Sequence, residues 1–155
     1  MKGMKRVHNI RATVFSKEEE NSQQIKQKLV ELFPFDLEKE KIKVNETTAT
    51  GFQEKRIKIF EVELSKEKTI NLFLKKMLEK LSPIQKRTLA GQKESRLDNE
   101  LYFFIRLDKE RMFNDEWGLT DGGNCYHIRL KIAAYPSNRE KALQAIDELF
   151  GKEKT

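Results

Sequence analysis

Two side chains in the second half of the chain have the types needed for nucleophilic or metal chemistry. Cys125 and His127 are separated by one residue, so on a strand they point to the same side and form a conceivable thiolate–imidazole pair. No third group that would orient the imidazole is recognisable. Zinc needs three or four ligands, and His8 is the only other histidine. The pattern therefore favours two ordinary surface side chains over a catalytic pair or a zinc site.

A group of acidic residues around Trp117 has the donor type that divalent cations prefer. Its members are Asp108, Glu110, Asp115, Glu116 and Asp121. Their spacing does not match a calcium-binding loop and is typical of a solvated face, so a metal-dependent hydrolase is the weakest alternative. Gly118 and the pair Gly122-Gly123 lack the spacing of a phosphate-binding loop and indicate a turn. We therefore predict no catalytic residue, no metal, no cofactor and no enzymatic activity.

Basic and aromatic side chains that alternate along three expected strands carry more information. A period of two places His127, Arg129 and Lys131 on one side of their strand, and the same reasoning applies to the other two strands. The candidate RNA-binding residues are Arg11, Tyr102, Phe104, Arg106, His127, Arg129 and Lys131. If the three strands are neighbours, these residues form one open sheet face. Its cations would neutralise phosphates and its rings would stack on unpaired bases.

The same residues are compatible with a different function. If a loop or a second subunit covers Tyr102 and Phe104, the cations only keep the chain soluble. If the two rings are exposed and meet a partner chain instead of bases, the chain is a protein-interaction adaptor. A second basic set consists of Lys75, Lys76, Lys80, Lys86 and Arg87. Glutamates lie among these residues, which is typical of a solvated helix surface.

The elements that position these residues follow from hydrophobic periodicity and capping residues. Strands are expected at residues 6–15, 39–46, 56–64, 101–107 and 125–134, the second of them weak and exposed. Helices are expected at 18–33, 67–81 and 83–91, as a short turn within 108–119, and after Ser137 as far as Gly151. Serines are expected to cap the helices, at Ser16, Ser65, Ser82 and Ser137. This order predicts an α+β fold, with one mixed or antiparallel sheet of about five strands and helices packed on one face.

Length and composition limit the class of protein. The 155 residues carry 31 Lys+Arg against 25 Asp+Glu, a net charge of +6, and 36% of the chain is charged. We expect one domain at residues 6–151, flexible termini at 1–5 and 152–155, and an undefined oligomeric state. One cysteine excludes an intrachain disulfide, and no apolar run approaches the ~18 residues that a membrane span needs. The basic residues near the N-terminus are followed by no hydrophobic stretch of the kind found in a signal sequence. A cytoplasmic location without membrane contact is expected.

Several short segments also resemble a known family. They are residues 7–10 (VHNI), 104–109 (FIRLDK) and 127–136 (HIRLKIAAYP), followed by Arg139 and Glu140. Together they resemble an archaeal family of predicted exosome-associated RNA-binding proteins, over roughly residues 7 to 150. The family's Asp-Lys element falls on Asp108 and Lys109, whereas the segment with Trp117 and Gly122-Gly123 departs from the family pattern.

The resemblance implies a fold like that of the large-subunit ribosomal protein that contacts five-S ribosomal RNA. It also implies RNA binding without known catalysis. We therefore expect an accessory protein of RNA processing or of the ribosome, with RNA as its partner and a possible place in a larger complex.

Overall fold

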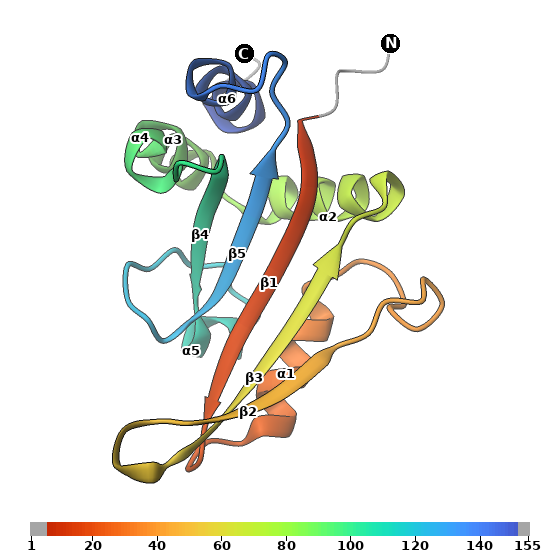
Figure 1. The fold of residues 1–155 in the computed structure, drawn as a ribbon, viewed down its shortest axis with the longest axis vertical. Helices are drawn as coiled ribbons and strands as arrows, with labels where there is room; N and C mark the ends of the chain where they lie inside the picture. The colour runs from red at the N-terminus through yellow and green to blue at the C-terminus, as the bar shows by residue number, and fades with distance from the viewer. Residues whose placement is uncertain (1–5, 152–155) are drawn as a thin grey trace.

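The computed structural model describes residues 6–151, which form one five-stranded sheet backed by helices (Figure 1). The strands are β1 (Val7–Lys17), β2 (Asn45–Thr50), β3 (Arg56–Leu64), β4 (Tyr102–Asp108) and β5 (Cys125–Ile132). The helices are α1 (Ser22–Glu31), α2 (Glu67–Lys80), α3 (Pro83–Gly91), α4 (Lys93–Arg96), α5 (Lys109–Met112) and α6 (Arg139–Ile146), which a π-helical turn (Asp147–Gly151) continues.

The strand order is β2-β3-β1-β5-β4, and every neighbouring pair is antiparallel. The predicted α+β class is confirmed, and the sheet is antiparallel rather than mixed. The termini expected to be flexible, 1–5 and 152–155, lie outside the described residues.

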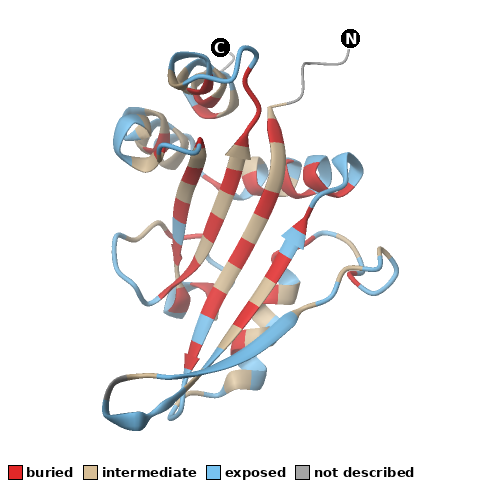
Figure 2. Ribbon diagram, in the orientation of Figure 1, coloured by how far each residue is buried: buried red, intermediate tan, exposed pale blue. Residues whose placement is uncertain are grey.

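The core lies between the sheet and the helices, because β1, β3, β4 and β5 alternate buried and more exposed side chains along their length (Figure 2). Helices α1 and α2 cross behind the sheet in Figure 1, while α3, α4 and α6 gather at the upper end of β4 and β5. Phe103 on the buried side of β4 stacks on Phe150, with ring centroids 5.5 Å apart, so the α6 segment packs on the same side as the other helices. Tyr126 is buried, and its hydroxyl donates a hydrogen bond to the carbonyl of Ile25 (2.9 Å). That bond ties α1 to β5.

Two helices form where the sequence pattern is strongest. On α2 the side chains of Ile70, Phe73 and Met77 are buried at the three- and four-residue spacing of one helix face. Helix α3 begins with the predicted cap: the Ser82 hydroxyl accepts from the Gln85 N–H (3.1 Å), and the Gln85 side chain accepts from the Ser82 N–H (2.8 Å). No helix within residues 6–151 is long and apolar enough to cross a membrane.

The first strand is longer than predicted, and the first helix is shorter. Ser16 was expected to cap the helix, but it lies within β1, paired with Lys58 and only 2% exposed. Helix α1 begins after Asn21, whose side chain accepts from the Gln24 N–H (3.2 Å). The period of two continues through Ser16, and the polar side chain at a core position concealed it.

The weak strand expected at 39–46 is wrong in position. The exposed edge strand β2 runs from Asn45 to Thr50 and pairs with β3, whereas residues 37–41 form turns and residues 42–44 are irregular. Asp36 stabilises the turns by accepting from the Glu38 N–H (2.9 Å). Ile42 and Val44 pack against the core from this irregular segment, so their spacing imitates a strand.

Two further predicted caps are shifted by one residue. Helix α2 follows Lys66, which provides no side-chain cap, and α6 follows Asn138, which accepts from the Lys141 N–H (2.8 Å). Ser65 and Ser137 therefore precede the capping positions.

Candidate nucleic-acid interface

The sheet places the predicted RNA-binding side chains of β4 and β5 directly beside one another. The cross-strand partners are Tyr102 with Lys131, Phe104 with Arg129, and Arg106 with His127. Their neighbours Phe103, Ile105, Ile128 and Leu130 are fully buried on the helix side. Because side chains alternate along a strand, the six candidates lie on the opposite side of the sheet.

Arg11 extends this surface onto β1, where it is the cross-strand partner of Arg129. We call the seven residues the basic face: Arg11, Tyr102, Phe104, Arg106, His127, Arg129 and Lys131. Arg106 is exposed and the other six are half-buried. None of the described helices lies over this side of β1, β4 and β5, which Figure 1 shows facing the viewer. The assumption that the three strands are neighbours is confirmed.

Cations and aromatic rings are in contact on the basic face. The guanidinium carbon of Arg129 lies 5.3 Å from the centre of the Tyr102 ring, and the Lys131 ammonium lies 4.7 Å from it. These distances are typical of cation–π interactions. The Lys131 ammonium also donates a hydrogen bond to the carbonyl of Glu100. Both cations are therefore held beside the ring.

His127 stacks on Phe104, with ring centroids 5.2 Å apart and planes 6° from parallel. Burial lowers the pKa of His127, and the nearby charges of Arg106 and Arg129 lower it further. Its Nε2 atom is buried and makes no hydrogen bond within the described residues. The imidazole is thus held neutral between two guanidinium groups.

Acidic residues limit the basic face on its β3 side. The Arg11 guanidinium lies 3.4 Å from a carboxylate oxygen of Glu63 and 3.9 Å from one of Glu61. These two glutamates project from β3 on the same side, opposite Arg11 and Thr13. Sequence reasoning missed them because it did not establish that β3 lies next to β1. The charge of Arg11 is already matched, which leaves the positive charge concentrated on β4 and β5.

Sequence reasoning also does not identify Arg96 as a residue in contact with the strands of the basic face. Its guanidinium donates to the carbonyl of Phe104 (3.1 Å) and lies 3.9 Å from a carboxylate oxygen of Asp121. Burial lowers the pKa of Arg96, and the charge of Arg106 lowers it further. Because α4 is only four residues long, it has no periodicity that would have indicated this contact.

The lone thiol does not have the surroundings of a nucleophile. Cys125 is buried, and burial is the main cause of a pKa raised above the ordinary value of a thiol. A reactive thiolate needs the opposite shift. Cys125 and His127 lie two residues apart on β5 and so point to the same side of the strand, as predicted, but the imidazole ring is stacked on Phe104.

Three of the acidic residues around Trp117, namely Asp108, Asp115 and Asp121, have separate partners. Asp108 accepts from the Arg111 N–H at the start of α5 (3.0 Å), and Asp115 forms an ion pair with Lys28 (2.8 Å). This pairing lowers the pKa of Asp115. Within residues 6–151 no three His, Cys, Asp or Glu side chains are grouped closely enough to hold a metal ion.

Lys109 is buried and makes its contacts within the fold. It is only 3% exposed, and its ammonium donates to the carbonyl of Phe15 (2.6 Å) and lies 3.3 Å from a carboxylate oxygen of Glu20. The Asp-Lys element of the sequence resemblance therefore caps α5 with Asp108 and secures the end of β1 with Lys109.

Part of the second basic set is also used within the fold. Lys76 donates to the carbonyl of Glu31 (2.5 Å) and Lys86 to that of Leu78 (3.1 Å). Burial lowers the pKa of Lys76, and nearby Lys80 lowers it further. These lysines lie on α2 and α3, on the other side of the sheet from the basic face.

Comparison with known proteins gives consistent results. A curated RNA-binding protein of Pyrococcus abyssi is 26% identical over 148 residues, 96% of either chain. The crystal structure of a protein from Archaeoglobus fulgidus has a TM-score of 0.83 and 29% identity, covering 92% of this chain and 99% of that one. A protein from Methanothermobacter thermautotrophicus shares the fold, with a TM-score of 0.77, 23% identity, and coverage of 94% of this chain and 99% of its own.

The family model described as RNA binding matches residues 9–134, a range that contains β1 from Asn9 onward and the whole of β2, β3, β4 and β5. The match therefore includes every residue of the basic face. The chain belongs to this RNA-binding family.

Proposed function

We propose that the chain binds single-stranded or structured RNA through the basic face. One observation carries this proposal: three neighbouring strands bring four positively charged side chains and three rings together on the side of the sheet that the described helices leave open. Membership of an RNA-binding family supports the same function. The name of the Pyrococcus abyssi relative, an RNA-binding protein, supports it as well.

The arrangement suits a flexible phosphate backbone with unpaired bases. Arg129 and Lys131 are two residues apart on β5, which separates them by about 6–7 Å along the strand, close to the spacing of successive phosphates. Tyr102 and Phe104 are half-buried, so each ring keeps some surface for a base. Glu61 and Glu63 on the β3 side would repel phosphates. We therefore place the RNA along β4 and β5.

A salt titration of RNA binding tests this placement. Arg129→Ala with Lys131→Ala should weaken the affinity about tenfold or more at moderate salt, because two phosphate contacts are lost. The slope of log affinity against log salt should become shallower by roughly one to two units. The buried neighbours Leu130 and Ile132 hold β5 in place, so a thermal melt should show both proteins folded.

The matched control removes the same charge from the other side of the sheet. Lys75→Ala with Lys80→Ala changes two exposed lysines of α2 and should leave the slope unchanged. Equal slopes for wild type and the β5 double variant, with both folded, would contradict the proposal. A loss in the α2 double variant alone would move the interface to the helices.

We also propose a cellular role, which is more specific than RNA binding. We propose a non-catalytic, cytoplasmic accessory of RNA processing or of the ribosome, with a fold related to the ribosomal protein that contacts five-S RNA. Association with an exosome belongs to the same proposal. Copurification of the native protein, before and after ribonuclease treatment, tests it: partners lost with the RNA support an RNA-bound accessory.

The alternative is a protein-interaction adaptor that uses Tyr102 and Phe104 against a partner chain. Partners that survive ribonuclease, and binding that does not weaken as salt rises, would favour the adaptor.

A further inference from the structure

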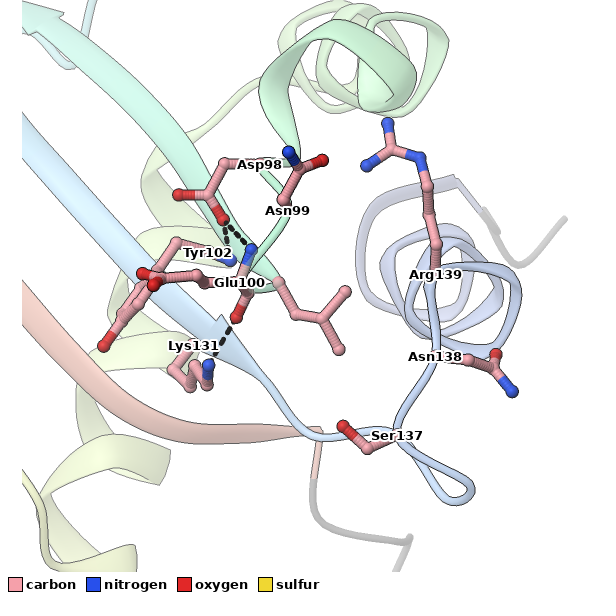
Figure 3. Close-up of a pocket in the computed structure, with 9 residues that line it drawn as sticks. Asp98, Asn99, Glu100, Tyr102, Lys131, Ser137, Asn138 and Arg139 are labelled. Atoms are coloured by element: carbon pink, nitrogen blue, oxygen red, sulfur yellow. Dashed lines mark hydrogen bonds between the residues drawn. The ribbon is translucent and has the colours of Figure 1, made fainter.

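A hollow of about 580 Å³ opens at the end of the sheet where the basic face meets α6. Figure 3 shows it between the turn that precedes β4 and the segment that leads into α6. The residues lining it are Asp98, Asn99, Glu100, Leu101, Tyr102, Lys131, Ser137, Asn138 and Arg139. Tyr102 and Lys131 belong to both the hollow and the basic face, so the two surfaces are continuous.

The wall formed by residues 98–102 is held by its own hydrogen bonds. A carboxylate oxygen of Asp98 accepts from the N–H groups of Glu100 and Tyr102, both at 2.9 Å. The carbonyl of Leu101 accepts from the Ile132 N–H (2.9 Å). Leu101 has a φ of 68°, a left-handed conformation that is costly for a leucine and that persists only when the surroundings fix it.

The opposite wall is fixed by Arg139. Its guanidinium donates to the carbonyls of Leu97 (3.0 Å) and Glu94 (2.7 Å), which joins the start of α6 to α4 and the turn after it. The hollow is therefore formed before any ligand binds, and binding costs little conformational entropy of the protein.

The charges of the lining restrict the chemistry of the occupant. Lys131 and Arg139 carry positive charge, whereas Asp98 and Glu100 carry negative charge. For a free inorganic anion or a metal ion, attraction by one pair of these side chains is offset by repulsion from the other pair. The lining suits a molecule that brings both an anionic group and hydroxyl or amino donors. A ribonucleotide has both, in its phosphate and in its 2′-hydroxyl, and the volume lies within the range of about 300 to 1,000 Å³ seen for small-ligand sites.

We propose that the hollow holds one unstacked ribonucleotide of an RNA strand that lies along the basic face. Its phosphate lies toward Lys131, its base lies beside Tyr102, and its 2′-hydroxyl donates to the Glu100 carboxylate. This inference rests on the proposed function and adds to it a site that selects RNA over DNA. The 2′-hydroxyl is the group by which a protein distinguishes the two.

The experiment compares single-stranded ten-residue oligouridine with oligodeoxyuridine, which differ only in the 2′-hydroxyl, by fluorescence anisotropy. Wild type should bind the RNA about tenfold more tightly than the DNA, the effect of one hydrogen bond to a charged acceptor. Glu100→Ala should reduce this ratio to about twofold or less. The substitution also removes a negative charge and so strengthens binding of both oligonucleotides, but the ratio cancels that effect.

A second variant and a control separate the hollow from the rest of the surface. Ser137→Leu places a larger side chain at an exposed position of the lining and should reduce the same ratio by obstructing the hollow. Glu79→Ala, at an exposed position of α2, removes the same charge elsewhere and should leave the ratio unchanged. Thermal melts confirm that each variant is folded.

The outcomes distinguish this inference from the proposed function. Equal binding of RNA and DNA by wild type, or an unchanged ratio in folded Glu100→Ala and Ser137→Leu, overturns the hollow as a ribonucleotide site. If Arg129→Ala with Lys131→Ala still weakens binding in that case, the basic face remains the interface. No binding of either oligonucleotide by wild type would overturn both.

Discussion

At the scale of single residues, the fold decides which titratable groups are available for chemistry. Cys125 is buried and its pKa is raised, so its thiol is protonated at neutral pH. Its partner by sequence spacing, His127, is stacked on Phe104 and has a lowered pKa. Neither shift suits a nucleophile and its base, since a thiolate–imidazolium pair requires the reverse of both.

We expect Cys125→Ser to leave RNA affinity within about twofold of wild type, because a protonated thiol contributes little to phosphate binding. The native thiol should also react with an aromatic disulfide reagent much more slowly than the thiol of the unfolded chain. Absorbance stopped-flow with and without denaturant measures this difference. Equal rates in the two states would show that the thiol is accessible and reactive.

The lowered pKa of His127 predicts a pH dependence of stability. In the unfolded chain the imidazole titrates near its ordinary value of 6.5, whereas in the folded chain it titrates lower. Between the two values the unfolded state binds more protons, so the free energy of unfolding falls as pH falls from about 6.5 through the folded-state pKa. His127→Gln should remove this part of the decline.

Chemical denaturation of wild type and His127→Gln at pH 7.5 and pH 5 checks this expectation. The second histidine, His8, is present in both proteins, so its contribution cancels in the comparison. Parallel declines in the two proteins would show that His127 titrates alike in the folded and unfolded states.

The composition of the basic face could be predicted from the sequence, because parity along a strand depends only on local alternation. The boundary of the basic face on its β3 side could not be predicted. Arg11 pairs with Glu63 across β1 and β3, and 38 residues of chain lie between the end of β1 at Lys17 and the start of β3 at Arg56. Local patterns do not contain the order of strands in a sheet, so neither this pairing nor the contact of Arg96 with Phe104 was predictable.

At the scale of elements, burial decides the contribution of each helix. The Phe73 side chain of α2 is fully buried, with its ring 5.3 Å from that of Phe33 and 6.2 Å from that of Trp117. Phe73→Ala should lower the free energy of unfolding by about 3 to 5 kcal/mol, as large-to-small changes in packed cores do. Leu72→Ala, at the adjacent position that is 37% exposed, is the control and should have a much smaller effect. Similar denaturation midpoints for the two variants would contradict the docking of α2.

The caps provide a second comparison between elements. Ser82→Ala removes the hydroxyl that accepts from the Gln85 N–H at the start of α3 and should destabilise the protein by about 1 kcal/mol. Ser65→Ala should be nearly neutral, because Ser65 precedes the unbonded cap of α2. Thermal melts of the two variants distinguish these results. A loss from Ser65→Ala equal to that from Ser82→Ala would show that both serines act as caps.

The elements with a strong period were predicted correctly, and the errors have physical causes. Strand β3 and helices α2 and α3 were expected within one residue of their ends, because their buried positions are apolar, with Thr69 of α2 the one polar exception. Ser16 breaks that pattern at a core position of β1. Strand β2 has no buried residue at all, so hydrophobicity could not locate it. It is positioned by its pairing with β3, to which an ion pair between Glu46 and Lys58 also joins it.

At the scale of the whole molecule, Lys109 joins segments that are distant in the sequence. It links α5 to the end of β1 through Phe15 and to the following turn through Glu20. Lys109→Met should destabilise the protein by about 1 to 3 kcal/mol, because the Phe15 carbonyl loses its donor and Glu20 its partner. The slope of RNA affinity against salt should not change, since Lys109 is buried away from the basic face. Denaturation and a salt titration of the same variant measure the two quantities, and a shallower slope would show that Lys109 contacts phosphate.

The hairpin of β2 and β3 extends from the molecule at its lower end in Figure 1. All six residues of β2 are exposed, and so are residues 53–55 in the turn between the strands. This turn is therefore a suitable insertion point for an affinity tag or a fluorescent protein. A label placed there would leave the core intact and would lie at the opposite end of the sheet from α6, so it could report on the position of the protein in a larger assembly without obstructing the basic face.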